Sequence, residues 1–156
     1  MANTEIVIVG PGEIPLIAEL YNEVFRPPRD EAFFRRRLMG RYNILLLVAQ
    51  LEGRPVGFSA GFELKPNTFF NWLVGVLPDF RRQGIASQLM DAQSAWALEH
   101  GYSLIRFECH NQHRVILMFA ISHAYDVVGI RWDSDRGDNL VIMEKRLTDH
   151  TETDAD

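Results

Sequence analysis

The sequence predicts an α/β fold whose sheet contains strands of mixed direction. Short segments typical of strands are interleaved along the chain with longer segments whose apolar residues recur at helical spacing. Two of the strand segments, NILLLVAQL and VGFSAGFEL, are separated only by a short turn with Glu52-Gly53 at its tip, which is typical of an antiparallel hairpin. The resulting order is β-α-α-β-β-β-α-β-α-β-β, in which some neighbouring strands are joined directly and others through helices.

Seven segments are predicted as strands because they are short, apolar or alternating, and bounded by turn residues. They are residues 5–9, 43–51, 56–64, 69–77, 103–109, 125–132 and 139–147. The turn DSDRGD separates the last two strands.

Four segments have helical spacing. They are residues 13–25, 30–39, 83–100 and 112–124. The Pro27-Pro28 pair ends the first of these helices. Gly101 closes the third helix as its C-cap. The apolar side of that third helix consists of Ile85, Leu89, Met90, Ala92 and Trp96.

Composition and charge limit the class of protein. The chain has 156 residues, 47% of them hydrophobic, which is typical of one globular domain, predicted over residues 1–148 and followed by an acidic, disordered tail at residues 149–156. No apolar stretch approaches the ~20 residues of a membrane span, and the N-terminus lacks the basic region of a signal peptide. The single cysteine excludes an internal disulfide, so we expect a cytoplasmic protein. The net charge of −5 argues against a nucleic-acid partner.

Basic residues gather in residues 26–41, RPPRDEAFFRRRLMGR, where six arginines face only two carboxylates. One interpretation is a solvated helix face. The other is a surface that contacts an anionic ligand or partner.

The segment VGVLPDFRRQGIAS, residues 74–87, joins a strand to a helix through a basic turn. A glycine inside a strand, here Gly75, indicates a bulge or a close approach, and predicts a strand that bends away from its neighbour. The backbone groups left unpaired in this way can bind the amides of an extended ligand.

The basic turn that follows has the features of a phosphate site. The first N–H groups of a helix have no internal partner, and the helix dipole favours an anion there. Gly84 and Ala86 leave the backbone accessible, and Arg81 and Arg82 can pair with phosphate oxygens. Neither a P-loop nor a dinucleotide-binding glycine motif is present. An amide-pairing edge followed by a phosphate site matches coenzyme A, although a plain turn with incidental arginines is the alternative.

The chain resembles the GCN5-related N-acetyltransferase (GNAT) superfamily over roughly residues 4–147. The family signature Q/R-x-x-G-x-G/A stands here as Arg81-Arg82-Gln83-Gly84-Ile85-Ala86, after the lead-in Val76-Leu77-Pro78. The downstream half of the pattern is matched by the strand Ile105 to Phe107, by Asn111, by the helix of residues 112–124 and by the step Ala124-Tyr125.

The resemblance implies a mixed, mostly antiparallel sheet of six to seven strands, with a splayed central strand pair and about four flanking helices. It implies acetyl-CoA as cosubstrate and acetyl transfer to a primary amine, of a small molecule or a peptide, by direct attack on the thioester. A non-catalytic acyl-CoA-binding module is the alternative, and a homodimer is left open. The implied pyrophosphate ligands are the backbone amides of Gln83, Gly84, Ile85, Ala86 and Ser87. Backbone groups of Val74 and Val76 would bind the pantetheine arm, which Asn111 would also contact.

One departure from the family concerns the general acid. Members often have a tyrosine about seven residues after the motif asparagine, to protonate the leaving thiolate. Here that position is Met118, with Phe119 beside it, and neither can donate a proton. Tyr125 falls at the aromatic position of the final step of the pattern, so we expect it in the core.

The strand SLIRFECH offers candidates for the general base that acyl transfer to an amine requires. Side chains alternate along a strand, so Arg106, Glu108 and His110 share one face. We expect Glu108 to be the base, with His110 as the second candidate. The alternative is that Arg106 and Glu108 form structural ion pairs, and Glu63 is a further carboxylate that we expect to be solvated.

No metal site is expected. His110 and His113 have no third ligand nearby in the sequence. Cys109, on the opposite face of the same strand, is expected to be a small buried residue rather than a nucleophile.

Overall fold

The fold was obtained as a computed structural model, which describes residues 3–148. Its strands are β1 (Glu5–Val9), β2 (Leu45–Leu51), β3 (Arg54–Lys65), β4 (Thr68–Val76), β5 (Leu104–His110), β6 (Asp126–Asp133) and β7 (Asp138–Arg146). Its helices are α1 (Ile14–Val24), α2 (Glu31–Leu38), α3 (Ile85–Glu99) and α4 (Arg114–Ser122), with short 3₁₀ turns η1 (Pro11–Glu13) and η2 (Pro78–Phe80). The element order agrees with the sequence prediction, and the acidic tail expected at residues 149–156 lies outside the described residues.

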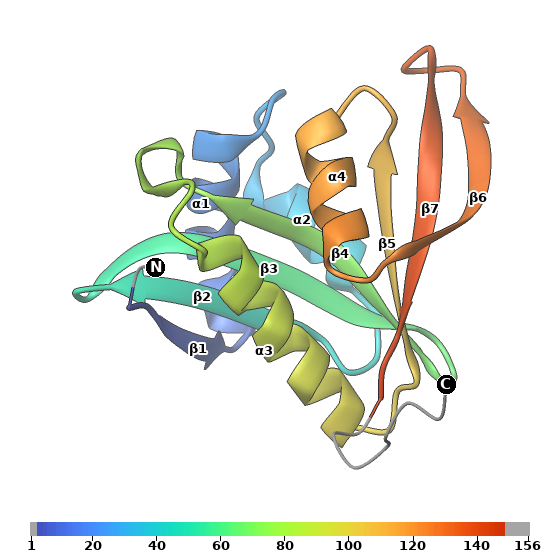
Figure 1. The fold of residues 1–156 in the computed structure, drawn as a ribbon. Coiled ribbons are helices and arrows are strands. Elements are labelled where there is room, and N and C mark those ends of the chain that lie inside the picture. Colours follow the sequence, from blue (N-terminus) through green and yellow to red (C-terminus); the bar gives the residue numbers. More distant parts are fainter. Residues whose placement is uncertain (1–2, 149–156) are drawn as a thin grey trace.

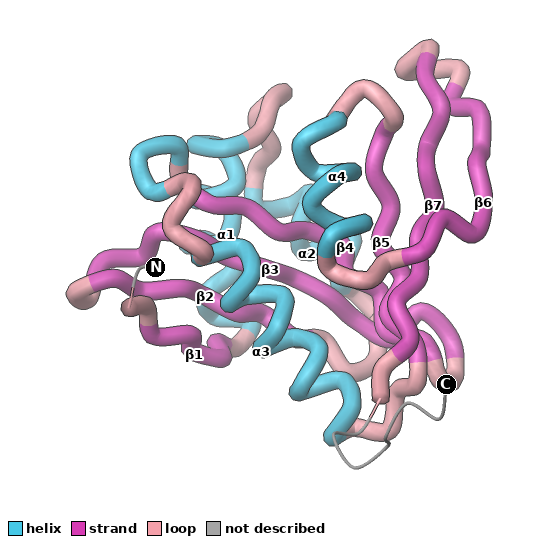
Figure 2. Tube along the Cα trace, in the orientation of Figure 1, coloured by secondary structure: helices cyan, strands magenta, loops and turns pink. Residues whose placement is uncertain are grey.

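The seven strands form one sheet in the order β1-β2-β3-β4-β5-β7-β6. Every neighbouring pair is antiparallel except β4 and β5, which are parallel because α3 connects them. The sheet is therefore mixed and mostly antiparallel, as expected. In Figure 1, α3 and α4 lie in front of the sheet, and α1 and α2 lie behind it. Figure 2 shows the same two helical layers in cyan around the magenta strands.

Alternating side chains of the sheet build a core on each face. In β2, Leu45 and Leu47 pack with the α3 side, whereas Leu46 and Val48 pack with the α1 side. The predicted apolar side of α3 is confirmed, since Ile85, Leu89 and Met90 are buried and Ala92 and Trp96 pack beside them.

The helix boundaries differ from the sequence prediction for local reasons. Helix α3 begins at Ile85 rather than at residue 83, because Arg82 and Gly84 have positive φ angles of 64° and 80°. It ends at Glu99, just before Gly101 at φ 88°, which is the left-handed position that often follows a helix.

Of the two interpretations of Gly75, the bulge is wrong and the close approach is confirmed. Gly75 lies opposite Phe58 in an uninterrupted stretch of the β3–β4 ladder, and the register shifts occur elsewhere, at Ala60/Gly61 and Glu63/Lys65. A Cβ atom at Gly75 would lie 2.8 Å from the Phe58 ring and 3.2 Å from the Phe25 ring. The glycine is needed because aromatic side chains cover the strand at this point.

Candidate functional site

The central strands β4 and β5 separate, as predicted. Only residues Thr68–Asn71 of β4 pair with β5, and their partners are Leu104–Phe107. Beyond this point β4 stays paired with β3 as far as Val76, and β5 stays paired with β7 as far as His110. Each strand keeps one neighbour, so a gap opens between them in the middle of the sheet.

The backbone of β4 presents polar groups to this gap. The Leu77 N–H donates to the Val56 carbonyl at 2.9 Å, which sets the phase of the antiparallel ladder. Alternate residues of such a ladder point their N–H and C=O groups to opposite sides, so those of Val74 and Val76 face away from β3. The Val76 carbonyl accepts a hydrogen bond from Arg81 Nε at 3.3 Å, which agrees with this direction.

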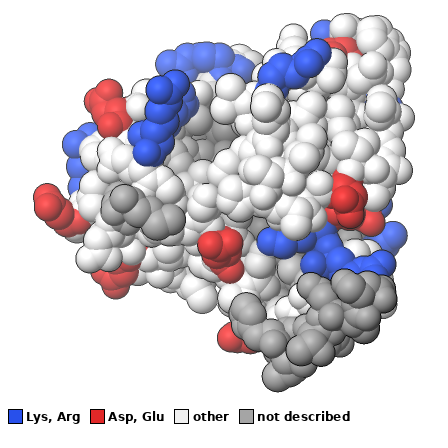
Figure 3. All heavy atoms as spheres, in the orientation of Figure 1, with Lys and Arg blue, Asp and Glu red and all other residues white. Residues whose placement is uncertain are grey.

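The turn between β4 and α3 places Gly84 at the N-cap of α3 with φ 80° and no side-chain cap. Gln88 N–H donates to the Gly84 carbonyl at 3.1 Å, so the N–H groups of the helical turn before it have no helical partner. Arg81 and Arg82 are exposed beside them. Figure 3 shows basic side chains over the segment between β4 and α3, next to a hollow in this face.

A contact between α3 and α4 closes one side of this region. Ser87 Oγ lies 2.9 Å from His123 Nε2, and His123 Nδ1 lies 2.8 Å from the Phe119 carbonyl. A carbonyl only accepts, so Nδ1 carries the proton and Nε2 accepts from the Ser87 hydroxyl. The sequence pattern gave no signal for His123, because its partner is 36 residues away.

A cleft of about 300 Å³ lies where strands β4 and β5 separate, and residues from both sides of the sheet line it. Its wall is mostly apolar and aromatic, with six titratable side chains among its residues. The lining consists of Phe25, Arg37, Phe70, Trp72, Leu73, Val74, Phe107, Glu108, Cys109, His110, His113, Ile116, Arg136 and Leu140. Both candidate bases are therefore brought into one cleft, together with Val74.

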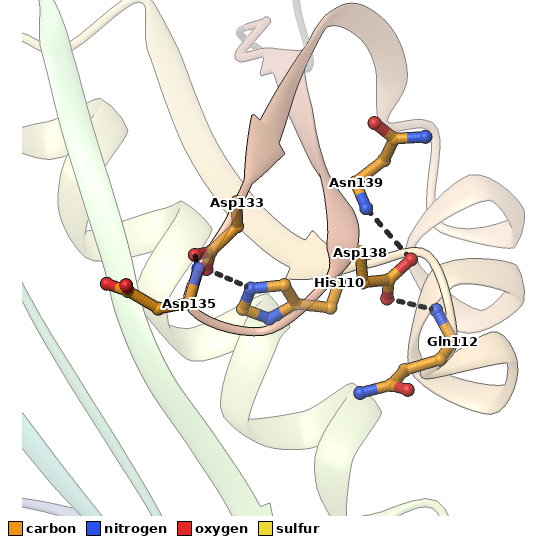
Figure 4. Close-up of polar contacts among 6 residues, drawn as sticks. All are labelled: His110, Gln112, Asp133, Asp135, Asp138 and Asn139. Carbon is orange, nitrogen blue, oxygen red and sulfur yellow. Dashed lines mark hydrogen bonds and ion pairs between the residues drawn. The ribbon is translucent and has the colours of Figure 1, made fainter.

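His110 is oriented by a carboxylate that the sequence did not single out. Its Nε2 lies 2.8 Å from Oδ2 of Asp133, and both side chains are largely buried (Figure 4). The hydrogen bond from His110 lowers the pKa of Asp133, with further help from the backbone N–H groups of Asp135 and Arg136. Asp133 is therefore ionised at neutral pH, and His110 Nδ1 remains available to accept a proton.

The segment between β5 and α4 is fixed by a second carboxylate. Asp138 accepts from the Gln112 N–H at 3.0 Å and from the Asn139 N–H at 2.8 Å (Figure 4). The Asn111 N–H donates to the Asn139 carbonyl at 2.8 Å. Asn111 thus lies half-buried at the end of β5, and its proposed contact with the pantetheine arm stays a prediction.

Glu108 has no ion-pair partner within residues 3–148. The predicted alternation of β5 is confirmed, because Ile105, Phe107 and Cys109 are buried and the intervening side chains are half-buried. Arg106 forms the expected ion pair, with Glu144 on β7 at 2.7 Å. Glu108 instead lines the cleft. Glu63, which we expected to be solvated, accepts a hydrogen bond from the Tyr102 hydroxyl at 3.0 Å.

Among residues 3–148, no tyrosine lines the cleft in place of the missing acid. Met118 is 69% exposed on the outer side of α4, and Phe119 packs against the core. Tyr125 is buried against Phe107, as expected. Burial raises the pKa of the Tyr125 phenol, although the neighbouring Asn71 side chain acts in the opposite direction.

Only one arginine of residues 26–41 lines the cleft, namely Arg37. Arg35 on the same helix pairs with Glu31 at 3.4 Å, in agreement with a solvated helix face. Arg26 lies beside a different cavity with Arg54. Arg35 therefore agrees with the solvated helix face, whereas contact of the arginines with an anionic ligand or partner stays a prediction.

No group of three His, Cys, Asp or Glu side chains in residues 3–148 is arranged to hold a metal ion. No helix there has the length and apolar character needed to cross a membrane.

Comparison with known proteins identifies related sequences and folds. A model of the acetyltransferase (GNAT) family matches residues 14–120. No curated protein matches the chain in sequence. The solved ribosomal-protein-S18-alanine N-acetyltransferase from Escherichia coli is similar with a TM-score of 0.81 and 15% identity, over 97% of this chain and 100% of that one.

Two further structures are similar over nearly their full length. Ard1 from Thermoplasma volcanium has a TM-score of 0.79 and 20% identity, over 94% of this chain and 99% of that one. A GNAT family acetyltransferase from Elizabethkingia anophelis, with acetyl-CoA bound, has a TM-score of 0.74 and 15% identity, over 94% of this chain and 100% of that one. At these identities the structures show a shared fold.

Proposed function

The chain belongs to the acetyltransferase (GNAT) family, and from this premise we propose that it transfers the acetyl group of acetyl-CoA to a primary amine. The observation that carries the proposal is the gap between β4 and β5, which has the basic turn before α3 at one side and a cleft containing His110 and Glu108 at the other. One ligand could span the two, with its phosphates at the turn and its thioester in the gap.

The residues around the gap fit acetyl-CoA. The free N–H groups of the first turn of α3, with Arg81 and Arg82 beside them, would hold the pyrophosphate through Gln83, Gly84, Ile85, Ala86 and Ser87. The outward backbone groups of Val74 and Val76 would pair with the pantetheine amides as a short false strand. Arg81 would first release the Val76 carbonyl, which its guanidinium contacts in this structure.

We assign the role of proton acceptor to His110 in preference to Glu108. Both line the cleft, but only His110 is held by a partner, Asp133, which leaves its Nδ1 free. The amine nitrogen would bond to the thioester carbonyl carbon as the carbon–sulfur bond breaks, and His110 would take the proton that the amine loses. The released thiolate would recover that proton through water, since Met118 and Phe119 cannot supply one.

Two measurements test the proposal. Millimolar acetyl-CoA should raise the Tm, because a ligand that binds only the folded state stabilises it. Release of CoA thiol should then accelerate when a panel of primary amines is added. No thermal shift would overturn the assignment of the site to acetyl-CoA.

A non-catalytic acyl-CoA-binding module is the second candidate. The position of Met118 in place of the usual tyrosine favours it. It predicts the same thermal shift with no thioester consumption for any amine, so the two measurements together separate the candidates.

The homodimer that the sequence leaves open has a candidate surface at β6. This strand is an edge of the sheet, and Val127 and Ile130 are 50% and 64% exposed. If two β6 strands paired antiparallel with Val128 of each strand opposite Gly129 of the other, each Asp126 would lie opposite an Arg131 and each Val127 opposite an Ile130. We propose that a second copy of the chain pairs with this edge, because the acidic residue of each strand would then lie opposite the basic residue of the other.

The mass in solution tests this arrangement. Light scattering should give a dimer at micromolar concentration, and Arg131→Asp should shift it to the monomer because like charges would then face each other. A wild-type monomer at every concentration would remove the proposal.

A further inference from the structure

The cleft contains two arginines, Arg37 and Arg136, that have no carboxylate within ion-pair distance among residues 3–148. From this we propose that the acceptor is a small amine that also carries a carboxylate and an apolar side chain, as a free aromatic or aliphatic amino acid does. The inference rests on the proposed function for the reaction itself, but the binding preference can be measured separately.

Arg37 is the first of these cations. It lies in α2, and within residues 3–148 no carboxylate approaches its guanidinium within ion-pair distance. By contrast, Arg35 is paired with Glu31, and Arg106 is paired with Glu144. An arginine that lines a cleft without a partner keeps its fork of N–H donors available for a carboxylate.

The position of the Arg37 head group is fixed by aromatic rings. Its guanidinium carbon lies 5.7 Å from the Trp72 ring centroid and 5.9 Å from that of Phe62. Such contacts favour a cation beside the rings while leaving its edge free to donate hydrogen bonds. Arg37 is therefore held at the aromatic wall of the cleft rather than extended into solvent alone.

Arg136 is the second cation without a partner. It lies in the turn between β6 and β7, lines the same cleft and has no ion pair among the described residues. Burial lowers the pKa of His113, and the charges of His110 and Arg136 lower it further, whereas Asp138 raises it. Arg136 thus lies near the histidine end of the cleft, close to the proposed proton acceptor.

Charges of both signs therefore line one cleft. Glu108 and His110 project from β5, and the two arginines come from α2 and from the β6–β7 turn. An amine would be attracted to the side of Glu108 and His110, and a carboxylate to the arginines. This arrangement matches a zwitterion better than a simple alkylamine, for which the arginines would be repulsive.

The remaining wall defines the rest of the acceptor. Phe25, Phe70, Trp72, Ile116 and Leu140 contribute apolar surface. The volume, about 300 Å³, is at the lower end of small-molecule sites. An amino acid with a large apolar side chain fits both properties. A peptide N-terminus offers the amine without a carboxylate on the neighbouring carbon, so it would leave the arginines unpaired.

Three matched acceptors test the inference: phenylalanine, phenylalaninamide and phenethylamine. They share the ring and the amine and differ at the carboxylate. The measurement is the initial rate of CoA thiol release at saturating acetyl-CoA. We expect the lowest KM for phenylalanine, by roughly tenfold or more, because a charge-assisted hydrogen bond has about that effect.

The variants Arg37→Gln and Arg136→Gln test whether the preference for an acceptor with a carboxylate arises in the cleft. Each should raise the KM for phenylalanine by roughly tenfold and leave that for phenethylamine unchanged or lower. Arg35→Gln, on the same helix but paired with Glu31, is the control and should change neither. Equal KM values for the three amines, unaltered in both cleft variants, would overturn the inference while leaving acetyl transfer intact.

Binding without turnover separates this inference from the proposed function. N-acetylphenylalanine and its amide can be titrated calorimetrically into protein saturated with CoA. Tighter binding of the carboxylate form, lost in Arg37→Gln, would support the inference even if no amine consumed the thioester. Equal binding of the two compounds would contradict it.

Discussion

Nε2 of His110 lies 2.8 Å from Oδ2 of Asp133, although 23 residues separate them in the sequence. The sheet produces this contact, because β7 pairs with both β5 and β6 and brings their ends together. His110 and Arg131 are both opposite Leu140, and Asp133 follows two residues later on β6. A hairpin that completes the sheet thereby also orients a side chain in the cleft.

Asp133→Asn should weaken catalysis without removing it. The amide cannot stabilise a protonated imidazole as the carboxylate does, so we expect kcat to fall by roughly tenfold, less than the ~10²–10⁴ loss typical of removing a general base. The KM for acetyl-CoA should stay unchanged, because Asp133 is not part of the turn that we propose to bind the pyrophosphate. Unaltered kcat would contradict the orienting role.

The same pair should make stability depend on pH in a defined direction. The pKa of Asp133 is lowered from its ordinary 3.8 by the hydrogen bond from His110. A lowered folded-state pKa contributes stability that is present above the unfolded value and is lost as pH falls through the folded value. The Tm difference between wild type and Asp133→Asn should therefore be complete at pH 5 and disappear progressively below pH 3.8. Thermal scans between pH 3 and pH 7 measure it.

Glu108→Gln tests the base that the sequence favours. It keeps the shape of the side chain but cannot accept a proton. If His110 is the base, Glu108→Gln should change mainly the KM for the amine, whereas His110→Gln should lower kcat by about 10²–10⁴. The reverse result would return the role to Glu108. Both variants should keep the acetyl-CoA thermal shift.

Local patterns predicted the parts of the site that lie within one segment. The alternation of β5 placed Glu108 and His110 on one face, and the glycine turn predicted the start of α3. The role of Gly75 required knowledge of the Phe58 and Phe25 rings, which come from other elements.

Long-range register accounts for most of what the sequence did not reveal. Asp133 reaches His110 because β7 pairs with both neighbouring strands, so that Leu140 lies opposite His110 on β5 and opposite Arg131 on β6. A local sequence pattern does not show which strands become neighbours. Which of the six arginines in residues 26–41 lines the cleft likewise depends on how α2 is rotated against β4.

The Arg106–Glu144 ion pair should contribute to stability and not to catalysis. The two side chains are 26% and 19% exposed, so removing one leaves the other partly desolvated without a partner. Arg106→Met should lower the free energy of unfolding by about 1–2 kcal/mol. The control is Arg35→Met at the exposed pair with Glu31, for which less than about 0.5 kcal/mol is expected. Equal losses of unfolding free energy in the two variants, measured by urea titration, would contradict this difference between the two ion pairs.

Cys109 lines the cleft but should not act as a nucleophile. Burial raises the pKa of its thiol to about 11, so only a small fraction is thiolate at pH 8. Cys109→Ala should retain kcat within about threefold, since no covalent step uses the sulfur, and iodoacetamide at pH 8 should label the folded protein much more slowly than the unfolded chain. An acetylated thiol detected by mass spectrometry after mixing with acetyl-CoA would show that this reading of Cys109 is wrong.

Gly84→Asp should abolish the acetyl-CoA thermal shift. The substitution places a side chain and a negative charge where the pyrophosphate would meet the first turn of α3, and it strains a backbone with φ 80°. The matched control is Gly101→Asp, at φ 88° beyond the other end of α3, where a Cβ atom meets nothing within 4 Å. Both variants should lose a similar amount of stability without ligand, about 1–2 kcal/mol, because both put a side chain into the left-handed region. Only Gly101→Asp should regain several degrees when millimolar acetyl-CoA is added. A normal shift in Gly84→Asp would mean that the phosphates bind elsewhere.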